Sequence, residues 1–345
     1  MRIELQQLCE RFVAAKQAVK EQFGFENTQI YPVCANVFCA KGIQPDAEQL
    51  ADCKKLLKAE TGPFSSFRGN LTAPIACMLA AGGNPEARLA QALEHYALLK
   101  TKFHASPYLA LAAFLLADMG ASACWEDVAA RGRGIYLRMK REHPVLTSAE
   151  DSLYAVFMAF SEKTDDALIA EMEDCYARLK LRFSSSNNVQ AASHVLCLAP
   201  GTPAEKTARM EQLYDAILAA GGKYGKTFEL PTLAALSLLD AEQDALVTDL
   251  MDVDGFLSAQ KGYGLLGIDR KTRMMHAAML VTDEYSTRQN RAEGSADRTP
   301  AEPSARTALG TAALAGTLAM LAAQQAAVCA AMTAAAASSA ASSHA

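Results

Sequence analysis

Ile135-Tyr136-Leu137-Arg138-Met139-Lys140 is followed forty residues later by Cys175-Tyr176-Ala177-Arg178-Leu179-Lys180. The same phrase stands forty residues upstream, as His95-Tyr96-Ala97-Leu98-Leu99-Lys100. A fixed period of this length is typical of repeat architectures. These three phrases therefore predict an array of similar structural units.

Apolar residues at helical spacing, interrupted by glycine and proline, divide the chain into helix pairs on both sides of these phrases. The predicted first helices span about 28–40, 71–82, 106–119, 148–161, 187–199 and 230–240. The predicted second helices span about 46–58, 85–102, 125–142, 165–182, 203–220 and 243–260. A helix over 2–24 precedes these pairs, and a helix over 269–283 follows them without a clear partner.

The first helix of each pair is apolar and the second is more charged, as expected for one inner and one outer row of helices. No stretch of useful length alternates like a β-strand. The sequence thus predicts an all-α protein built from about six two-helix repeats of roughly 40 residues. An open, HEAT-like α-solenoid is the first choice, and a closed α/α toroid built from the same hairpins is the alternative.

The composition divides the chain into three parts. Residues 1–283 carry the repeats, and residues 284–306 are polar, charged and proline-bearing, which predicts a flexible linker. From residue 307 to 345 there is no Asp, Glu, Lys or Arg, and alanine predominates before a serine-rich end that we expect to be disordered. Alanine favours a helix there. We expect this helix to dock on the array or on a second subunit, which allows an oligomer.

A membrane anchor through 307–345 is the less favoured interpretation, because alanine is weakly apolar and Gln324-Gln325 interrupts the run. A net charge of −5 argues against nucleic acid as the main partner. The nine cysteines are odd in number and none form a Cys-x-x-Cys pair, which favours a reducing cytoplasm.

Familiar catalytic motifs are absent from the sequence: there is no GxxxxGK[ST], no HExxH and no GxSxG. Gly132 and Gly134 lie within a predicted helix, where close helix packing is a better explanation than phosphate binding. Cys34 and Cys39 are spaced off one helix face and have no nearby histidine, so no metal site is predicted. The sequence identifies no cofactor.

The segments that enter the first helices are unusually polar. In a stacked array they would align as one strip beside several helix N-termini, which favour anions. The candidate ligand-binding residues are Arg68, Asn70, His143, Thr147, Ser148, Asp151, Asn187, Asn188, Gln190 and His194.

Helix capping is the simpler explanation for the same residues. Thr147-x-x-Glu150 has the spacing of a capping box, and Ser148 or Asn187 has the type of an N-cap. His194 lies one helical turn from Gln190 on an apolar helix, where a histidine is more often a hydrogen-bonded core residue than a catalyst. Asp151, from the preceding unit, is its candidate partner.

One family resembles this order of residues. His143-Pro144 followed by Thr147-Ser148 and Asp151, and then Asn188-x-Gln190-x-x-Ser193-His194-x-Leu196, resembles an uncharacterised bacterial family of Firmicutes type, a domain of unknown function. The resemblance covers about residues 5–283. It implies a soluble, bacterial, all-helical protein and brings no assigned activity.

The sequence therefore leads to a cytoplasmic helical-repeat protein that serves as a binding or scaffold module. The expected partner is a protein segment or a small anionic molecule near residues 143–194. The alternative is an enzyme with a toroidal cavity that uses His194 or Asp151 as acid or base.

Overall fold

The computed structural model describes residues 1–24, 30–118, 124–264 and 267–294. These residues form fourteen α-helices and one short 3-10 helix, and apart from an isolated bridge between Tyr263 and Ile268 they contain no β-structure. The all-α class predicted from the repeats is therefore confirmed.

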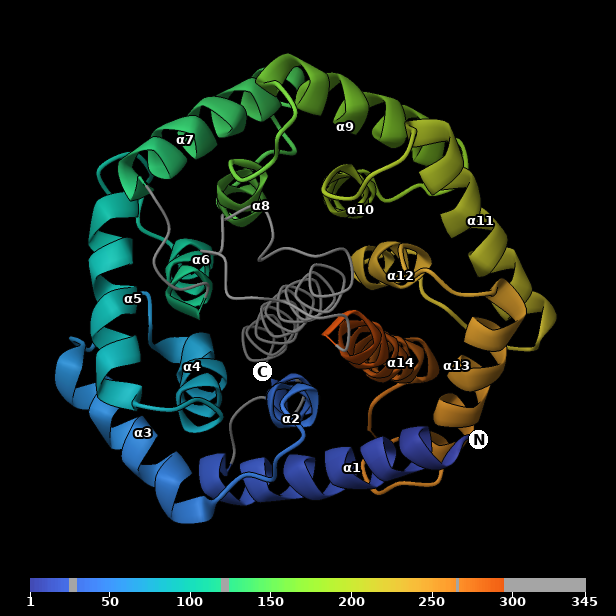
Figure 1. The fold of residues 1–345 in the computed structure, drawn as a ribbon, viewed down its shortest axis with the longest axis horizontal. Helices are drawn as coiled ribbons and strands as arrows, with labels where there is room; N and C mark the ends of the chain where they lie inside the picture. The colour runs from blue at the N-terminus through green and yellow to red at the C-terminus, as the bar shows by residue number, and fades with distance from the viewer. Residues whose placement is uncertain (25–29, 119–123, 265–266, 295–345) are drawn as a thin grey trace, which may run out of the picture.

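The helices lie in two concentric rows, with the even-numbered helices inside and the odd-numbered helices outside (Figure 1). The inner helices are α2 (Ile30–Ala40), α4 (Thr72–Ala80), α6 (Pro107–Asp118), α8 (Asp151–Met158), α10 (Ser186–Cys197), α12 (Leu230–Ser237) and α14 (Arg270–Gly294). The outer helices are α1 (Ile3–Phe23), α3 (Ala47–Glu60), α5 (Pro85–Leu99), α7 (Trp125–Glu142), α9 (Asp165–Lys180), α11 (Pro203–Ala219) and α13 (Gln243–Ser258). The 3-10 helix η1 (Gly69–Leu71) leads into α4.

The apolar pattern of each helix explains its row. Every residue of α4, α8 and α12 is buried, as their almost continuously apolar sequences require. The outer helices bury one stripe only. In α9 that stripe is Leu168, Met172, Cys175 and Leu179, spaced three or four residues apart.

Gly132 lets α7 pack closely against α8. A Cβ atom on Gly132 would lie 3.2 Å from the carbonyl oxygen of Ala155 and 3.2 Å from the Cα atom of Val156. On Gly134 a Cβ atom would meet nothing within 4 Å. The packing explanation therefore holds for Gly132 but not for Gly134.

The expectation that the last helix lacks a partner is wrong. Helix α14 packs against α13, α12, α1 and α2, so the last described helix lies beside the first two (Figure 1). Helix α14 resembles the apolar first helix of a repeat but has no second helix after it, and α1 resembles a second helix but has no first helix before it. Together they complete the alternation of inner and outer helices.

Polar contacts tie these two ends together. Arg2 donates from Nη2 to Asp249 Oδ2 at 2.7 Å and from Nη1 to Glu284 Oε1 at 2.9 Å. The Tyr285 hydroxyl donates to Asp249 Oδ2 at 2.8 Å. Asp249 and Glu284 have side chains that are only 7% and 10% exposed, so Arg2 neutralises two largely buried carboxylates.

Helix α14 continues to Gly294, eleven residues beyond the predicted end at residue 283. Tyr285 and Ser286 are buried, so this part of the chain packs on the array as the earlier helices do. Residues 284–294 thus belong to the helix and not to the predicted linker. The remainder of that linker, 295–306, and the alanine-rich part, 307–345, lie outside the described residues.

No helix of the described part of the chain combines the length and the apolar character needed to cross a lipid bilayer.

Candidate functional site

The structure brings together part of the predicted polar strip, between α8 and α10. Gln190 Nε2 donates to Thr147 Oγ1 at 3.0 Å, and Thr147 Oγ1 donates to the Met139 carbonyl at 3.1 Å. Thr147 and Gln190 are both almost completely buried. We call Thr147, Glu150, Asp151, Gln190 and His194 the α8–α10 polar layer.

Asp151 lies beside His194, as predicted, with Oδ1 3.4 Å from the Nδ1 atom of the imidazole. Both side chains are at most 3% exposed, and the imidazole also packs against the Tyr154 ring with centroids 5.3 Å apart. Burial raises the pKa of Asp151 to about 7 and lowers the pKa of His194 to about 3. Each shift has the same cause, because a charge is costly in an environment without water.

The predicted capping box is absent, because α8 begins after Glu150 and has no side-chain cap hydrogen bond. The backbone N–H of Ser148 donates to Asp151 Oδ2 at 2.7 Å, and the Glu150 N–H donates to Ser148 Oγ at 3.4 Å. Thr147 takes no part, because its hydroxyl is used in the α8–α10 polar layer. Ser148 and Asp151 thus stabilise the turn that leads into α8.

Asn187 contacts the preceding repeat, and Asn188 contacts a residue of its own segment. Asn187 is exposed and donates from Nδ2 to Glu150 Oε1 at 2.6 Å, linking the start of α10 to the start of α8. Asn188 Nδ2 donates to Ser185 Oγ at 2.6 Å. The residue that precedes α10 is Ser185, so Asn187 is not the N-cap.

His143 belongs to a repeated aromatic contact that sequence inspection missed. Its ring packs on Tyr176 with centroids 4.5 Å apart, and its Nε2 atom lies 3.0 Å from Glu173 Oε2. Equivalent pairs recur around the array: Phe67 with Tyr96, Phe103 with Tyr136, and Phe183 with Tyr214. Residues 67, 103, 143 and 183 are spaced by 36, 40 and 40, so His143 takes the place of a phenylalanine between units.

Arg68 and Asn70 lie apart from this group, against α3. They line a cavity of about 450 Å³ together with Lys54 and Lys58. None of the residues that line it is acidic. The single strip predicted by stacking therefore divides into the α8–α10 polar layer and this separate basic cavity.

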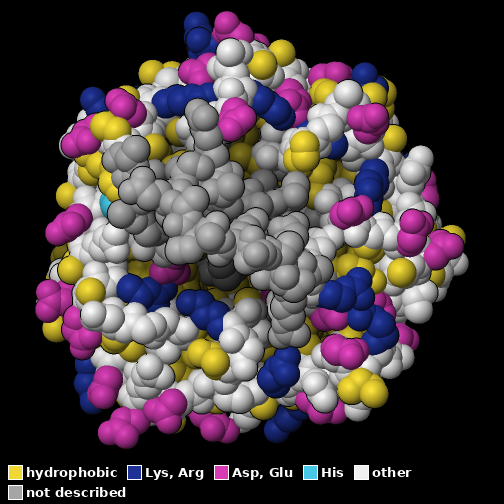
Figure 2. Space-filling model, in the orientation of Figure 1, with side chains coloured by type: hydrophobic (Ala, Val, Ile, Leu, Met, Phe, Trp, Pro, Cys, Tyr) yellow, Lys and Arg dark blue, Asp and Glu magenta, His cyan; other side chains and the backbone are white. Residues whose placement is uncertain are grey.

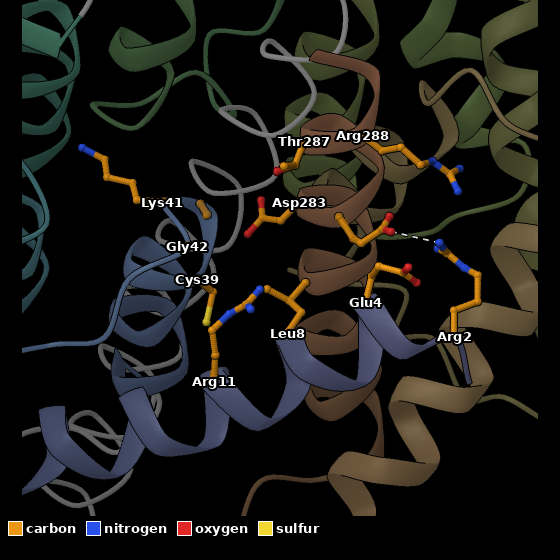
Figure 3. A pocket seen from close by; sticks show the side chains of 12 residues that line it. Arg2, Glu4, Leu8, Arg11, Cys39, Lys41, Gly42, Asp283, Thr287 and Arg288 are labelled. Carbon is orange, nitrogen blue, oxygen red and sulfur yellow. Dashed lines mark hydrogen bonds and ion pairs between the residues drawn. The ribbon is translucent and has the colours of Figure 1, made fainter. Parts of the chain in front are cut away.

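A third site, not predicted from the sequence, lies where the first two described helices meet the last one. A cavity of about 460 Å³ opens between α1, α14 and the end of α2. We call it the seam pocket. Figure 3 shows Asp283 pointing from α14 toward the end of α2, with Arg11 rising from α1 and Lys41 extending away from Asp283.

Hydrogen-bonding atoms of the seam pocket are buried without protein partners. Among the described residues, Asp283 Oδ2, Arg11 Nε and Glu284 Oε2 have no hydrogen-bond partner. Asp283 is only 6% exposed. A buried polar atom left unpaired costs about 1–3 kcal/mol, so three such atoms around one cavity indicate a place where another molecule could supply the partners.

The charge of the seam pocket is positive. Its cations are Arg2, Arg11, Lys41 and Arg288, and its acids are Glu4, Asp283 and Glu284. Arg2 is already paired with Glu284. Burial raises the pKa of Asp283 to about 8 and so favours its protonated form. The neighbouring Asn36 amide opposes this shift, but its Nδ2 and Oδ1 atoms are themselves without a hydrogen bond of good geometry among the described residues.

The seam pocket lacks an evident nucleophile or metal centre. Burial raises the pKa of the Cys39 thiol to about 12, so it stays protonated and unreactive. Within the described ranges, no group of three or more His, Cys, Asp or Glu side chains could hold a metal ion. What the arrangement offers is hydrogen bonding and positive charge.

One feature of the sequence points to this site. Asp283 follows Met279, Leu280 and Val281 in an apolar helix, where an acid is unusual. Its significance depends on α1 lying opposite, and no periodicity shows that.

The chain belongs to the family described as a protein of unknown function, DUF4003, which it matches over residues 16–326. The match extends beyond residue 283, where the resemblance seen in the sequence ended, into the alanine-rich part. No curated protein matches the chain significantly, and no solved structure does.

Proposed function

We propose that this chain is a closed α/α toroid rather than an open solenoid. The support comes from contacts between its ends: α14 packs on α1 and α2, and α13 packs on α1. Arg2 and Glu284, 282 residues apart in sequence, form an ion pair. An open solenoid would leave α1 and α14 at opposite ends with unpaired apolar faces.

We further propose that the toroid binds a small anionic ligand in the seam pocket. The carrying observation is the buried, unpartnered Asp283 Oδ2 facing a cavity of about 460 Å³, a volume typical of small-molecule sites. Arg11 makes no ion pair among the described residues, so its guanidinium is free to meet a carboxylate or phosphate. The protonated Asp283 would donate a hydrogen bond to the same ligand.

The enzyme alternative receives less support. His194 and Asp151 are adjacent, which acid–base chemistry needs, yet both side chains are at most 3% exposed. A substrate would reach them only after α8 and α10 separate. A position inside the cytoplasm also remains a proposal, and it agrees with the eight described cysteines all being free.

The test is thermal unfolding of the full chain with a panel of anions: inorganic phosphate, nucleoside monophosphates, and di- and tricarboxylates. A ligand at 100 times its Kd stabilises the folded protein by about 2.7 kcal/mol. We expect one class to raise the Tm of the unaltered chain. Arg11→Gln should abolish the rise, whereas Lys58→Gln, in the basic cavity with Arg68, should preserve it.

Two results would reject the proposal. If no anion raises the Tm, the pocket has no ligand of this class. If the rise is lost in Lys58→Gln and kept in Arg11→Gln, the anion binds beside Arg68 instead. Arg11→Gln is a suitable variant, because Arg11 has no ion pair whose loss would itself destabilise the fold.

A further inference from the structure

We propose that one face of this protein docks peripherally on an anionic phospholipid surface. The face consists of the connections through which the chain passes from an outer helix to the following inner helix. Five of these connections are described in full: 61–68, 100–106, 143–150, 181–185 and 220–229. We call these five connections the docking face. The proposal requires neither the seam pocket nor closure of the ring.

The five connections lie side by side on one face of the molecule. An aromatic contact joins each of the first four to the outer helix that leads into the next connection: Phe67 to Tyr96, Phe103 to Tyr136, His143 to Tyr176, and Phe183 to Tyr214. The connections therefore form a continuous row. Figure 1 shows the inner helices end-on, with the connections from inner to outer helices toward the reader, so the docking face is the far one.

The docking face exposes three large apolar side chains. Phe64 is fully exposed, and Val145 and Leu181 are 92% and 91% exposed. Among the described residues the next most exposed large apolar side chain is Ile3, at 71%. A single exposed apolar residue is ordinary in a globular protein. Here, however, the three most exposed ones all belong to the same row of connections.

The docking face also has a surplus of positive charge. Its five connections contain two acids, Glu150 and Glu229, which are both buried. They contain six cations: Arg68, Lys100, Lys102, Arg182, Lys223 and Lys226.

The opposite face lacks this surplus. Its five fully described connections, 41–46, 81–84, 159–164, 198–202 and 238–242, contain two lysines and four acids. Figure 2 shows that face, on which Lys and Arg side chains lie among Asp and Glu side chains. The two faces therefore differ in the sign of the charge that their connections carry.

Some of the cations of the docking face have no acidic partner. Lys102 and Lys223 are exposed and form no ion pair with another described residue. Positive charge near the ends of the outer helices also complements their dipoles, so charge alone does not identify a partner. The combination of unpaired cations with exposed apolar side chains does, because anionic lipid surfaces attract both.

A flat partner fits this arrangement best. Phe64, Val145 and Leu181 lie in three different connections, so they are distributed along the row and do not form the single groove that a peptide would need. A membrane meets all connections at once: apolar side chains enter the boundary below the headgroups, and cations face the lipid phosphates. Nucleic acid is bound by cations together with aromatic stacking surfaces, whereas Val145 and Leu181 are aliphatic.

Vesicle flotation of the full chain tests the proposal, using phosphatidylcholine vesicles with and without about 30% phosphatidylglycerol. We expect binding to the anionic vesicles, and loss of most of it at about 0.5 M salt, because salt screens the attraction. The combined variant Phe64→Ser, Val145→Ser and Leu181→Ser should partition at least about tenfold more weakly, because it removes the apolar surface that the bilayer buries. Lys102→Glu with Lys223→Glu should also weaken binding about tenfold or more.

Two control variants are matched to these in residue type. Ile43→Ser removes an exposed apolar side chain from the opposite face, and Lys55→Glu reverses an exposed lysine within α3. Both should bind the anionic vesicles as the unaltered chain does. All of the altered side chains are exposed, so circular dichroism and the Tm should show that every variant is folded.

Three results would overturn the proposal. The first is that the unaltered chain does not bind anionic vesicles. The second is binding that survives both sets of substitutions on the docking face, because the membrane contact would then lie elsewhere in the chain. The third is binding to an oligonucleotide but not to vesicles at the same low salt, which would assign the docking face to nucleic acid.

Discussion

The α8–α10 polar layer and the seam pocket are both built from buried polar side chains, but their surroundings differ. In the layer, Gln190 donates to Thr147, Thr147 donates to the Met139 carbonyl, and Asp151 faces His194 at 3.4 Å. In the seam pocket, Asp283 Oδ2 has no partner among the described residues and faces a cavity of about 460 Å³. The layer satisfies most of its polar groups within the protein, although Gln190 Oε1 and His194 Nδ1 have no hydrogen-bond partner among the described residues. The unpaired atoms of the seam pocket belong to side chains that line a cavity.

This difference distinguishes polar side chains that stabilise the fold from polar side chains that could bind a ligand. A buried group that is hydrogen-bonded within the protein fixes the position of its helix, as Thr147 does between α7 and α10. A buried group without a partner keeps a cost of about 1–3 kcal/mol until another molecule binds to it. The residues of the α8–α10 polar layer were predicted as part of a binding site because they are polar. The seam pocket is the better candidate for binding because the side chains that carry its unpaired atoms line a cavity.

The largest expected effect tests how tightly α7 packs against α8, the helix that follows Thr147 of the α8–α10 polar layer. Gly132→Leu should destabilise the protein by about 3 kcal/mol or more, because its Cβ atom would press on the backbone of α8 at 3.2 Å. Gly134→Leu, two residues away and without a neighbour within 4 Å, should change the stability by about 1 kcal/mol or less. Urea unfolding of both variants measures the difference. Equal losses would mean that α7 and α8 are not in close contact.

A matched pair of threonines compares the two regions directly. Thr147→Val should cost about 2 kcal/mol, because it leaves Gln190 Nε2 unpaired in a buried site and removes one of the two hydrogen bonds to the Met139 carbonyl, which still accepts from the His143 N–H. Thr287→Val, in the seam pocket, should cost less than about 0.5 kcal/mol, since its hydroxyl has no hydrogen bond within the described residues. Chemical denaturation gives both values. A larger loss for Thr287→Val would reverse the comparison.

The third comparison is the pH dependence of stability at the seam pocket. The pKa of Asp283 is about 8 in the fold against its ordinary value of 3.8, so the folded state binds its proton more tightly. Its contribution to stability is complete below pH 3.8 and declines as the pH rises through 8, by at most about 1.4 kcal/mol per pH unit. Asp283→Asn does not titrate, so its Tm relative to the unaltered chain should rise between pH 5 and pH 8.5.

Asp244→Asn is the control for that series, because Asp244 is an exposed residue on α13. Its Tm difference from the unaltered chain should stay constant over the same range. A constant difference for Asp283→Asn as well would show that Asp283 is ionised throughout, which would remove the hydrogen-bond donor from the proposed site. In the α8–α10 polar layer the raised pKa of Asp151 and the lowered pKa of His194 have opposite effects on stability, so their pH dependences partly cancel.

The sequence was sufficient to locate the helix pairs, but it did not show that the first and last described helices lie side by side. Apolar spacing and glycine–proline punctuation located the helix pairs, because those signals act within a few residues. The contact of Arg2 with Glu284 joins residues 282 positions apart, and no period predicts it. The same limit explains why Asp283 was overlooked.

Candidate site residues in neighbouring repeats were easier to place together from the sequence than residues in distant repeats. Asp151 and His194 were correctly paired because their helices follow one another in the array. Arg68 was assigned to the same strip although two units separate it from them. His143 was taken for a candidate ligand because it was judged by residue type, whereas its repeat position shows that it substitutes for Phe67, Phe103 and Phe183.

Lysine crosslinking of the unaltered monomer tests the closed ring most directly. Lys16 Nζ on α1 lies 3.3 Å from the Lys261 carbonyl oxygen, just after α13. Burial lowers the pKa of Lys16 to about 8, so a larger fraction of its amine is neutral and reactive than for an ordinary lysine. A short-spacer reagent followed by mass spectrometry should join Lys16 to Lys261. In an open solenoid six units at about 10 Å each would separate them. Absence of that crosslink, while neighbouring units still crosslink, would contradict the ring and the seam pocket together.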